Sequence, residues 1–121
     1  MIYTSYFGKL KNIPKNIIPV AICGRCPDWY NGLKYKKVAP KYGFFQEYKK
    51  TGDENYYISH YNDEVLSILT PEEVYSDLMK LTNNAEDIVL LCYEKPEDFC
   101  HRHILADWLS KYNIHVEEFK E

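Results

Sequence analysis

The run Asp87–Tyr93 (DIVLLCY) constrains the fold more than any other part of the chain. It is apolar without the alternation that a half-exposed strand shows, so both of its faces must be covered. The polar loop Glu94–Asp98 follows, and then apolar residues recur along one face of a helix. A doubly covered strand followed by an amphipathic helix is typical of a parallel sheet in an α/β fold.

The rest of the chain repeats this alternation of strand and helix. Pro19 restricts its strand to an edge position or to the start of the strand. Thr70 and Pro71 have the residue types of an N-cap and a first helical position. We expect one small Rossmann-like three-layer α/β domain over residues 1–121, with a mainly parallel sheet and helices on both faces. The predicted strands are 2–7, 17–23, 87–93 and 114–119, the predicted helices are 42–50, 54–69, 71–81 and 99–112, and residues 24–40 are predicted to form an irregular loop.

Length and composition exclude several classes of protein. At 121 residues the chain is too short for two ordinary domains. No apolar run approaches the roughly 20 residues that cross a bilayer, and the first residues lack the apolar core of a secretory signal. We therefore expect a cytoplasmic protein without a membrane partner. Four cysteines are too few for a disulfide scaffold, and we expect them to be reduced.

The two halves of the chain carry opposite charge. Residues 1–60 contain ten Lys and Arg against four Asp and Glu, whereas residues 61–121 contain five against fourteen. The basic half includes a segment, residues 25–42, in which lysines alternate with aromatic residues, as in surfaces that bind phosphates and stacked bases. A solvated basic loop that faces the acidic half is the ordinary explanation. The residues available for binding there are Trp29, Tyr30, Tyr35, Lys36 and Lys37.

Reactive side chains surround the junction between the strand 87–93 and the following helix. Cys92 is at the strand end and Glu94 follows two residues later, while Cys100, His101 and Arg102 fall in the first helical turn. Free backbone N–H groups favour an anion at a helix N-terminus, and an arginine adds a planar fork that suits phosphate or carboxylate. The same environment lowers the pKa of a cysteine. The junction is therefore a candidate anion or thiolate site.

Each of these residues also has an ordinary structural explanation. Cys92 can be a small buried apolar residue, and His103 can simply be exposed. Arg102 can pair with an acidic neighbour, and Glu94 can form a salt bridge. The alternative partners are Asp98 or Asp107 for Arg102, and Lys95, Arg25 or Arg102 for Glu94.

The sequence LLCYEKPEDFCHRHILADWL resembles the hallmark of the domain-of-unknown-function family 488, and Ile22–Pro40 is similar to an upstream signature of that family. The resemblance implies a small Rossmann-like domain with a Leu-Cys-x-Glu strand end and a Cys-His-Arg helix start. It implies no settled reaction. Cys23 stands where family members more usually have a serine. The matching residues are Leu91, Cys92, Glu94, Cys100, His101 and Arg102.

The residues of the chain raise four specific chemistries. A redox pair at Cys23 and Cys26 has the right spacing, but Pro27 and the loop after it do not predict the helix that such a pair needs. A phosphatase loop needs Cys-x5-Arg, which neither Cys92 nor Cys100 forms with Arg102. A glutamate-based glycosyl or nucleoside transfer remains open, with Glu94 as nucleophile or base. A zinc site also remains open as a minor alternative, and its candidate ligands are Cys23, Cys26, Cys92, Cys100, His101 and His103.

The leading hypothesis is a phosphate or nucleotide-type anion site between the loop after Cys23 and the loop after Cys92. The expected partner is a small phosphate-bearing ligand or a nucleic acid, and no cofactor is expected. Whether the domain is an enzyme stays open, and its rival is a non-catalytic nucleic-acid or protein-binding module that uses segment 25–42. The candidate catalytic residues are Cys92, Glu94 and His101, and the candidate ligand-binding residues are Arg25, Cys100, Arg102, Trp29, Tyr35 and Lys36.

Overall fold

A computed structural model describes residues 1–120 and contains a five-stranded sheet in the order β3-β2-β4-β1-β5. Every strand pair in the sheet is parallel. The predicted α/β fold with a parallel sheet is therefore confirmed. The strands are β1 (Ile2–Tyr6), β2 (Ile18–Ala21), β3 (Leu33–Lys34), β4 (Ile88–Cys92) and β5 (Val116–Glu118).

Strand β4 lies inside the sheet between β2 and β1, and all five of its residues are buried. Its continuous apolar sequence is explained by this position, because both faces and both edges are covered. Pro19 is tolerated in β2 because its nitrogen faces away from β4. Ile18 and Ile22 donate N–H bonds toward β4, to Asp87 and Leu91, and β3 begins only opposite Val20.

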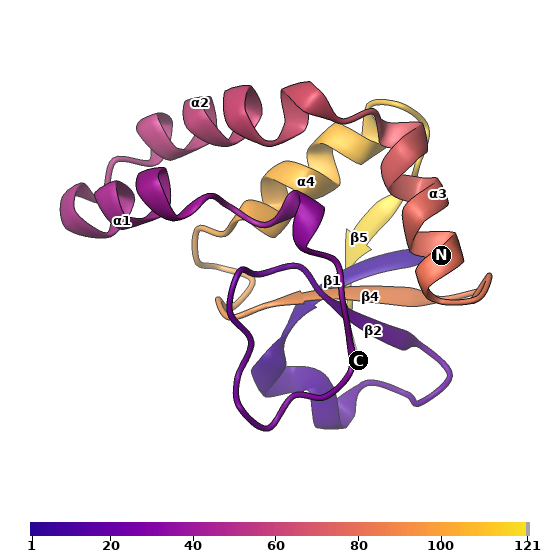
Figure 1. Cartoon of the computed structure of the whole chain (residues 1–121). Helices are drawn as coiled ribbons and strands as arrows, with labels where there is room; N and C mark the ends of the chain where they lie inside the picture. The colour runs from indigo at the N-terminus through magenta and orange to yellow at the C-terminus, as the bar shows by residue number, and fades with distance from the viewer. Residues whose placement is uncertain (121) are drawn as a thin grey trace.

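All four α-helices lie on one side of the sheet (Figure 1), whereas the sequence predicted helices on both faces. Helix α1 ends at Gly52, whose φ of 70° is the left-handed conformation that glycine adopts without strain. Thr70 caps α3 as predicted, because its side chain accepts a hydrogen bond from the N–H of Glu73, and Pro71 is the first helical residue. The helices are α1 (Tyr42–Thr51), α2 (Glu54–Glu64), α3 (Pro71–Leu81) and α4 (His101–Ser110).

The other face of the sheet is covered by the 3-10 helix η1 (Phe7–Asn12) and the loop that follows β2 (Figure 1). Two apolar clusters result. One joins Val20, Ile88 and Leu90 to the α-helices, and the other joins Val89 and Leu91 to Phe7, Ile13 and Tyr30. Neighbouring residues of β4 thus enter opposite layers, as the alternation of side chains along a strand requires.

Two sequence predictions were wrong in detail. Residues 24–40 are not wholly irregular, since β3 and the 3-10 helix η2 (Lys36–Val38) lie within them. The helix predicted over 54–69 ends at Glu64 and is followed by the 3-10 helix η3 (Leu66–Ile68). No helix within residues 1–120 has the length and apolar character to cross a membrane.

Candidate functional site

A cavity of about 770 Å³ lies at the carboxyl ends of β2 and β4. The loop after β2 contributes Cys23 and Arg25, the end of β4 and its loop contribute Cys92 and Glu94, and the start of α4 contributes Cys100. The two chain segments that were expected to face each other therefore line one cavity. Such a crevice is the usual ligand position of an open parallel sheet.

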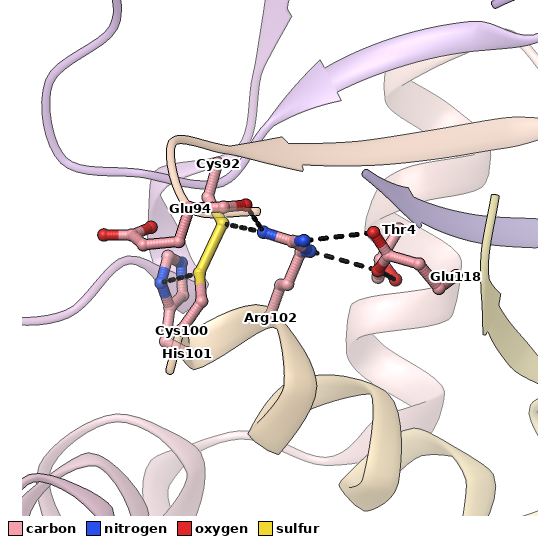
Figure 2. A network of polar contacts seen from close by, with 7 residues as sticks. All are labelled: Thr4, Cys92, Glu94, Cys100, His101, Arg102 and Glu118. Atoms are coloured by element: carbon pink, nitrogen blue, oxygen red, sulfur yellow. Dashed lines mark hydrogen bonds and ion pairs between the residues drawn. A yellow bond between two sulfur atoms is a disulfide. The ribbon is translucent and has the colours of Figure 1, made fainter. Parts of the chain in front are cut away.

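Cys92 and Cys100 form a disulfide in the wall of this cavity (Figure 2). Cys92 is the last residue of β4, and Cys100 is the N-cap of α4, so the fold itself brings the two residues together. Both are almost completely buried, with exposed fractions of 1% and 4%. The structure therefore differs from the expectation that all four cysteines are reduced.

Arg102 does not line the cavity, because its guanidinium is buried behind the disulfide with no exposed surface (Figure 2). It donates two hydrogen bonds to the Glu118 carboxylate at 3.2 and 3.0 Å. It also donates to the Cys92 Sγ at 2.9 Å and to the backbone oxygen of Glu94 at 2.5 Å. Arg102 therefore does not contact an anion in the cavity, as the sequence had suggested. Its guanidinium instead fixes the end of β4 and the loop that follows.

The partner of Arg102 is Glu118, and not Asp98 or Asp107 as the sequence predicted. It lies on β5, and its carboxylate also accepts a hydrogen bond from the Thr4 hydroxyl at 2.7 Å. The sequence signal that could have identified this partner was the presence of an acidic residue, Glu118, inside the predicted strand 114–119. The pairing of β5 with β1, which brings Glu118 beside Thr4, is not visible in the sequence.

His101 is buried beneath the cavity and holds the start of α4 against β2. Its Nε2 lies 2.8 Å from the backbone oxygen of Ile22, so the ring proton is on Nε2. Its Nδ1 lies 3.7 Å from the Cys100 Sγ. Burial lowers the pKa of His101 to about 4, which keeps the imidazole neutral near pH 7. A neutral ring with one nitrogen occupied suits a positioning role better than acid–base exchange.

Among the described residues, Glu94 is the one acidic residue that lines the cavity. Figure 2 shows its side chain directed away from Arg102, on the opposite side of the disulfide. Within residues 1–120 the carboxylate forms no hydrogen bond or ion pair, so none of its predicted salt bridges is observed. Its backbone is held by Arg102 while its side chain faces the cavity.

The Cys23–Cys26 pair has the wrong electrostatics for redox catalysis. The two sulfurs are 3.9 Å apart, and the Cys23 thiol is directed at the backbone oxygen of Arg25. Burial, and then the neighbouring Cys26, raise the pKa of Cys23 to about 12, whereas a reactive thiol needs a lowered pKa. A turn follows Cys26 where a redox motif would have a helix.

An aromatic wall forms the helical side of the cavity and was not foreseen. The rings of Tyr48, Tyr57 and Phe99 lie with centroids 5.0 to 5.2 Å apart. The Lys49 ammonium lies 5.0 Å from the centre of the Phe45 ring at the same wall. The spacing of Phe45 and Tyr48 on one helix was the signal that could have located the wall.

The basic segment 25–42 contributes less free surface than expected. Tyr30 and Tyr35 are buried, and their hydroxyls donate to the Leu33 backbone oxygen at 2.7 Å and to the Asp77 carboxylate at 2.6 Å. Lys37 pairs with Asp77 at 3.0 Å. Two of the aromatic side chains are therefore unavailable for stacking on bases.

The remaining candidates of this segment lie away from the site. Trp29 is 60% exposed, and its ring makes a T-shaped contact with the Phe7 ring. Lys36 and Tyr35 line a separate, shallower cavity of about 430 Å³ next to α3. Trp29, Tyr35 and Lys36 thus do not join Arg25 and Glu94. His103, expected to be exposed, is partly buried, and its Nε2 has no partner within residues 1–120.

Comparison with known proteins agrees with the sequence resemblance. The family model DUF488-N3a, described as the active DUF488-N3 subclade, matches residues 7–113. No curated protein and no solved structure matches the chain. The matched segment contains both walls of the cavity and all of the Leu-Cys-x-Glu and Cys-His-Arg residues. The chain therefore belongs to the DUF488 family.

Proposed function

We propose that the cavity binds a nucleotide-type ligand and that Glu94 is its catalytic carboxylate. One observation carries the proposal: a cationic side chain, a carboxylate that has no partner within residues 1–120 and an aromatic wall line a single cavity. A volume of about 770 Å³ is in the range of small-molecule sites. The cavity offers a flat aromatic surface that suits a base and a cationic side that suits a phosphate, and this combination indicates a nucleotide.

The anionic end of the ligand is assigned to the side of the cavity formed by Arg25 and the start of α4. Arg25 is exposed at the cavity, and its guanidinium forms no ion pair within residues 1–120. The first turn of α4 contains no acidic residue, and no side chain caps it. Its N–H groups and the helix dipole therefore favour a phosphate there.

The flat end of the ligand is assigned to the aromatic wall. Stacking of a base on an aromatic side chain contributes about 1 to 3 kcal/mol and depends little on which base is bound. Tyr48 and Phe99 belong to different segments, so a ring placed on this wall contacts both α1 and the loop that carries Glu94. Binding would therefore bring the ligand next to the carboxylate.

Glu94 supplies the group for chemistry. A carboxylate that faces a cavity without a partner can act as nucleophile or as general base, and Arg102 fixes its backbone from behind. The class of reaction that fits is transfer or hydrolysis at a sugar or phosphate of the bound nucleotide.

The test uses calorimetric titration of the full chain with a mononucleotide, with its nucleoside and with inorganic phosphate. We expect Arg25→Ala to weaken mononucleotide binding about 10-fold to 100-fold, the equivalent of one charge-assisted contact, and to leave the nucleoside unaffected. Lys36→Ala is the matched control, because it removes an exposed cation outside the cavity. Glu94→Gln should retain binding and lose turnover.

Two results would contradict the proposal. Equal losses of affinity in Arg25→Ala and Lys36→Ala would place binding on the exposed surface of segment 25–42 outside the cavity. An affinity for single-stranded nucleic acid that falls steeply with salt would do the same. Full turnover of a nucleotide by Glu94→Gln would remove the catalytic assignment.

A further inference from the structure

Three soft ligand groups meet in the cavity wall. The sulfurs of Cys92 and Cys100 and the Nδ1 of His101 all lie within 4.8 Å of one another. All three residues are buried, yet all three line the cavity. Thiolate and imidazole are the ligands that zinc and similar cations prefer. The cluster lies on two elements, the end of β4 and the start of α4.

The surroundings of the cluster are those of metal ligands. The Nε2 of His101 donates to the Ile22 backbone oxygen at 2.8 Å, which leaves the lone pair of Nδ1 directed at the sulfurs. Metal-binding histidines commonly donate their second ring N–H to a backbone carbonyl in this way. Arg102 donates to the Cys92 Sγ at 2.9 Å, a contact that stabilises a thiolate.

We propose that, when the disulfide is reduced, Cys92, Cys100 and His101 bind one zinc ion, with the fourth coordination position open to the cavity. A low-molecular-weight thiol supplies the electrons: two thiols reduce the Cys92–Cys100 disulfide to two cysteine thiols and become a disulfide themselves. Zn²⁺ then displaces both thiol protons and binds the two thiolates and the neutral imidazole.

The geometry requires only a small adjustment. Tetrahedral zinc, with about 2.3 Å to sulfur and about 2.0 Å to nitrogen, places S and N roughly 3.5 Å apart. The Cys100 Sγ and the His101 Nδ1 are 3.7 Å apart. The two sulfurs must separate to roughly 3.8 Å, and their Cα atoms, 7.7 Å apart, leave room for this.

The charges also balance. Two thiolates offset the charge of the ion, and Glu118 offsets the charge of Arg102, with which it is paired at 3.0 Å. Three protein ligands with an open position facing a cavity are typical of catalytic zinc sites, in contrast to the four closed ligands of structural sites. The proposal stands independently of the nucleotide assignment, because metal binding is measured without any nucleotide.

The experiment compares the reduced and the oxidised full chain after incubation with Zn²⁺ and removal of the excess. Native mass spectrometry should find one zinc per reduced chain and none on the oxidised chain. Co²⁺ in place of Zn²⁺ should give a thiolate-to-cobalt charge-transfer absorption band. Cys92→Ser and Cys100→Ser should both lose stoichiometric binding, whereas Cys26→Ser, which changes a cysteine outside the cluster, should retain it.

A measurement on the unaltered chain covers the case in which a variant fails to fold. Zinc should slow the alkylation of Cys92 and Cys100 by iodoacetamide, mapped by peptide mass spectrometry, and leave the rate at Cys26 unchanged. Protection of Cys23 and Cys26 instead, or of no cysteine, would overturn the proposal. Zinc binding by the oxidised chain, or a cobalt complex without the charge-transfer band, would do the same.

Discussion

Glu118→Gln offers the sharpest test of how the site is supported. The substitution keeps the shape of the side chain but removes the charge opposite Arg102, whose guanidinium is fully buried. Two charge-assisted hydrogen bonds, at 3.2 and 3.0 Å, are weakened together with the bond from Thr4 at 2.7 Å. Breaking a buried ion pair costs about 3 to 5 kcal/mol because the remaining charge has no partner.

The expected loss is smaller than that full value for two reasons. Glutamine retains one oxygen that can accept from Arg102, and the Glu118 side chain is already 19% exposed, so water can partly replace the contact. We therefore expect a loss of about 2 to 3 kcal/mol in the free energy of unfolding. For a chain of 121 residues, this corresponds to a decrease of about 10 °C in Tm.

Urea unfolding followed by far-ultraviolet circular dichroism measures the loss, and the neighbouring strand residue provides the control. Glu117 is exposed and pairs only with the exposed His115 within residues 1–120, so Glu117→Gln should change stability by less than about 0.5 kcal/mol. Equal effects of the two substitutions would refute the claim that Arg102 depends on Glu118.

Three further outcomes follow from local geometry. Gly52→Ala should destabilise the chain by about 1 kcal/mol because φ there is 70°, whereas Gly43→Ala, an equally open position inside α1, should stabilise it by about 0.5 to 1 kcal/mol; chemical unfolding of both variants checks the opposite signs. Thr70→Ala removes the N-cap of α3 and should cost about 1 kcal/mol, so an unchanged unfolding midpoint would contradict the cap. The Tyr35 hydroxyl, and then Lys37, lower the pKa of Asp77 below its ordinary 3.8, so the stability that this carboxylate contributes is present at neutral pH and is lost as the pH falls through its folded-state pKa. The stability advantage of the unaltered chain over Asp77→Asn should therefore shrink as the pH is lowered from neutral to values below the ordinary pKa of 3.8. A constant difference would be evidence against the contact.

The elements that carry a strong local pattern were predictable. Strand β4 has a continuous apolar sequence because it is covered on all sides. Helix α3 begins with a threonine N-cap followed directly by a proline, which is a recognisable helix start. Strand β3 has no such signal. It has two residues and is held by backbone pairing with β2, and backbone pairing leaves no mark on residue type.

The candidate site was predictable as a place but not as a set of contacts. Cys92, Glu94 and Cys100 converge on one cavity with Arg25, as expected from the strand end and the helix start. Arg102 lies behind the disulfide because it pairs with Glu118 on β5. Strand β5 is distant from β4 in the sequence and pairs with β1. The aromatic wall depends on how α1 and α2 fold over the sheet. Neither of these long-range arrangements is encoded in a local spacing.

The order of the strands has a consequence for synthesis on the ribosome. Strand β1 is made first and lies between β4 and β5, which are made last. Thr4 and Glu118, which are hydrogen-bonded in the folded chain, are 114 residues apart. The nascent chain must therefore keep β1 unpaired until β4 has been made, and a long-lived unpaired strand promotes pairing with other chains. Slow translation should thus favour aggregation over early folding.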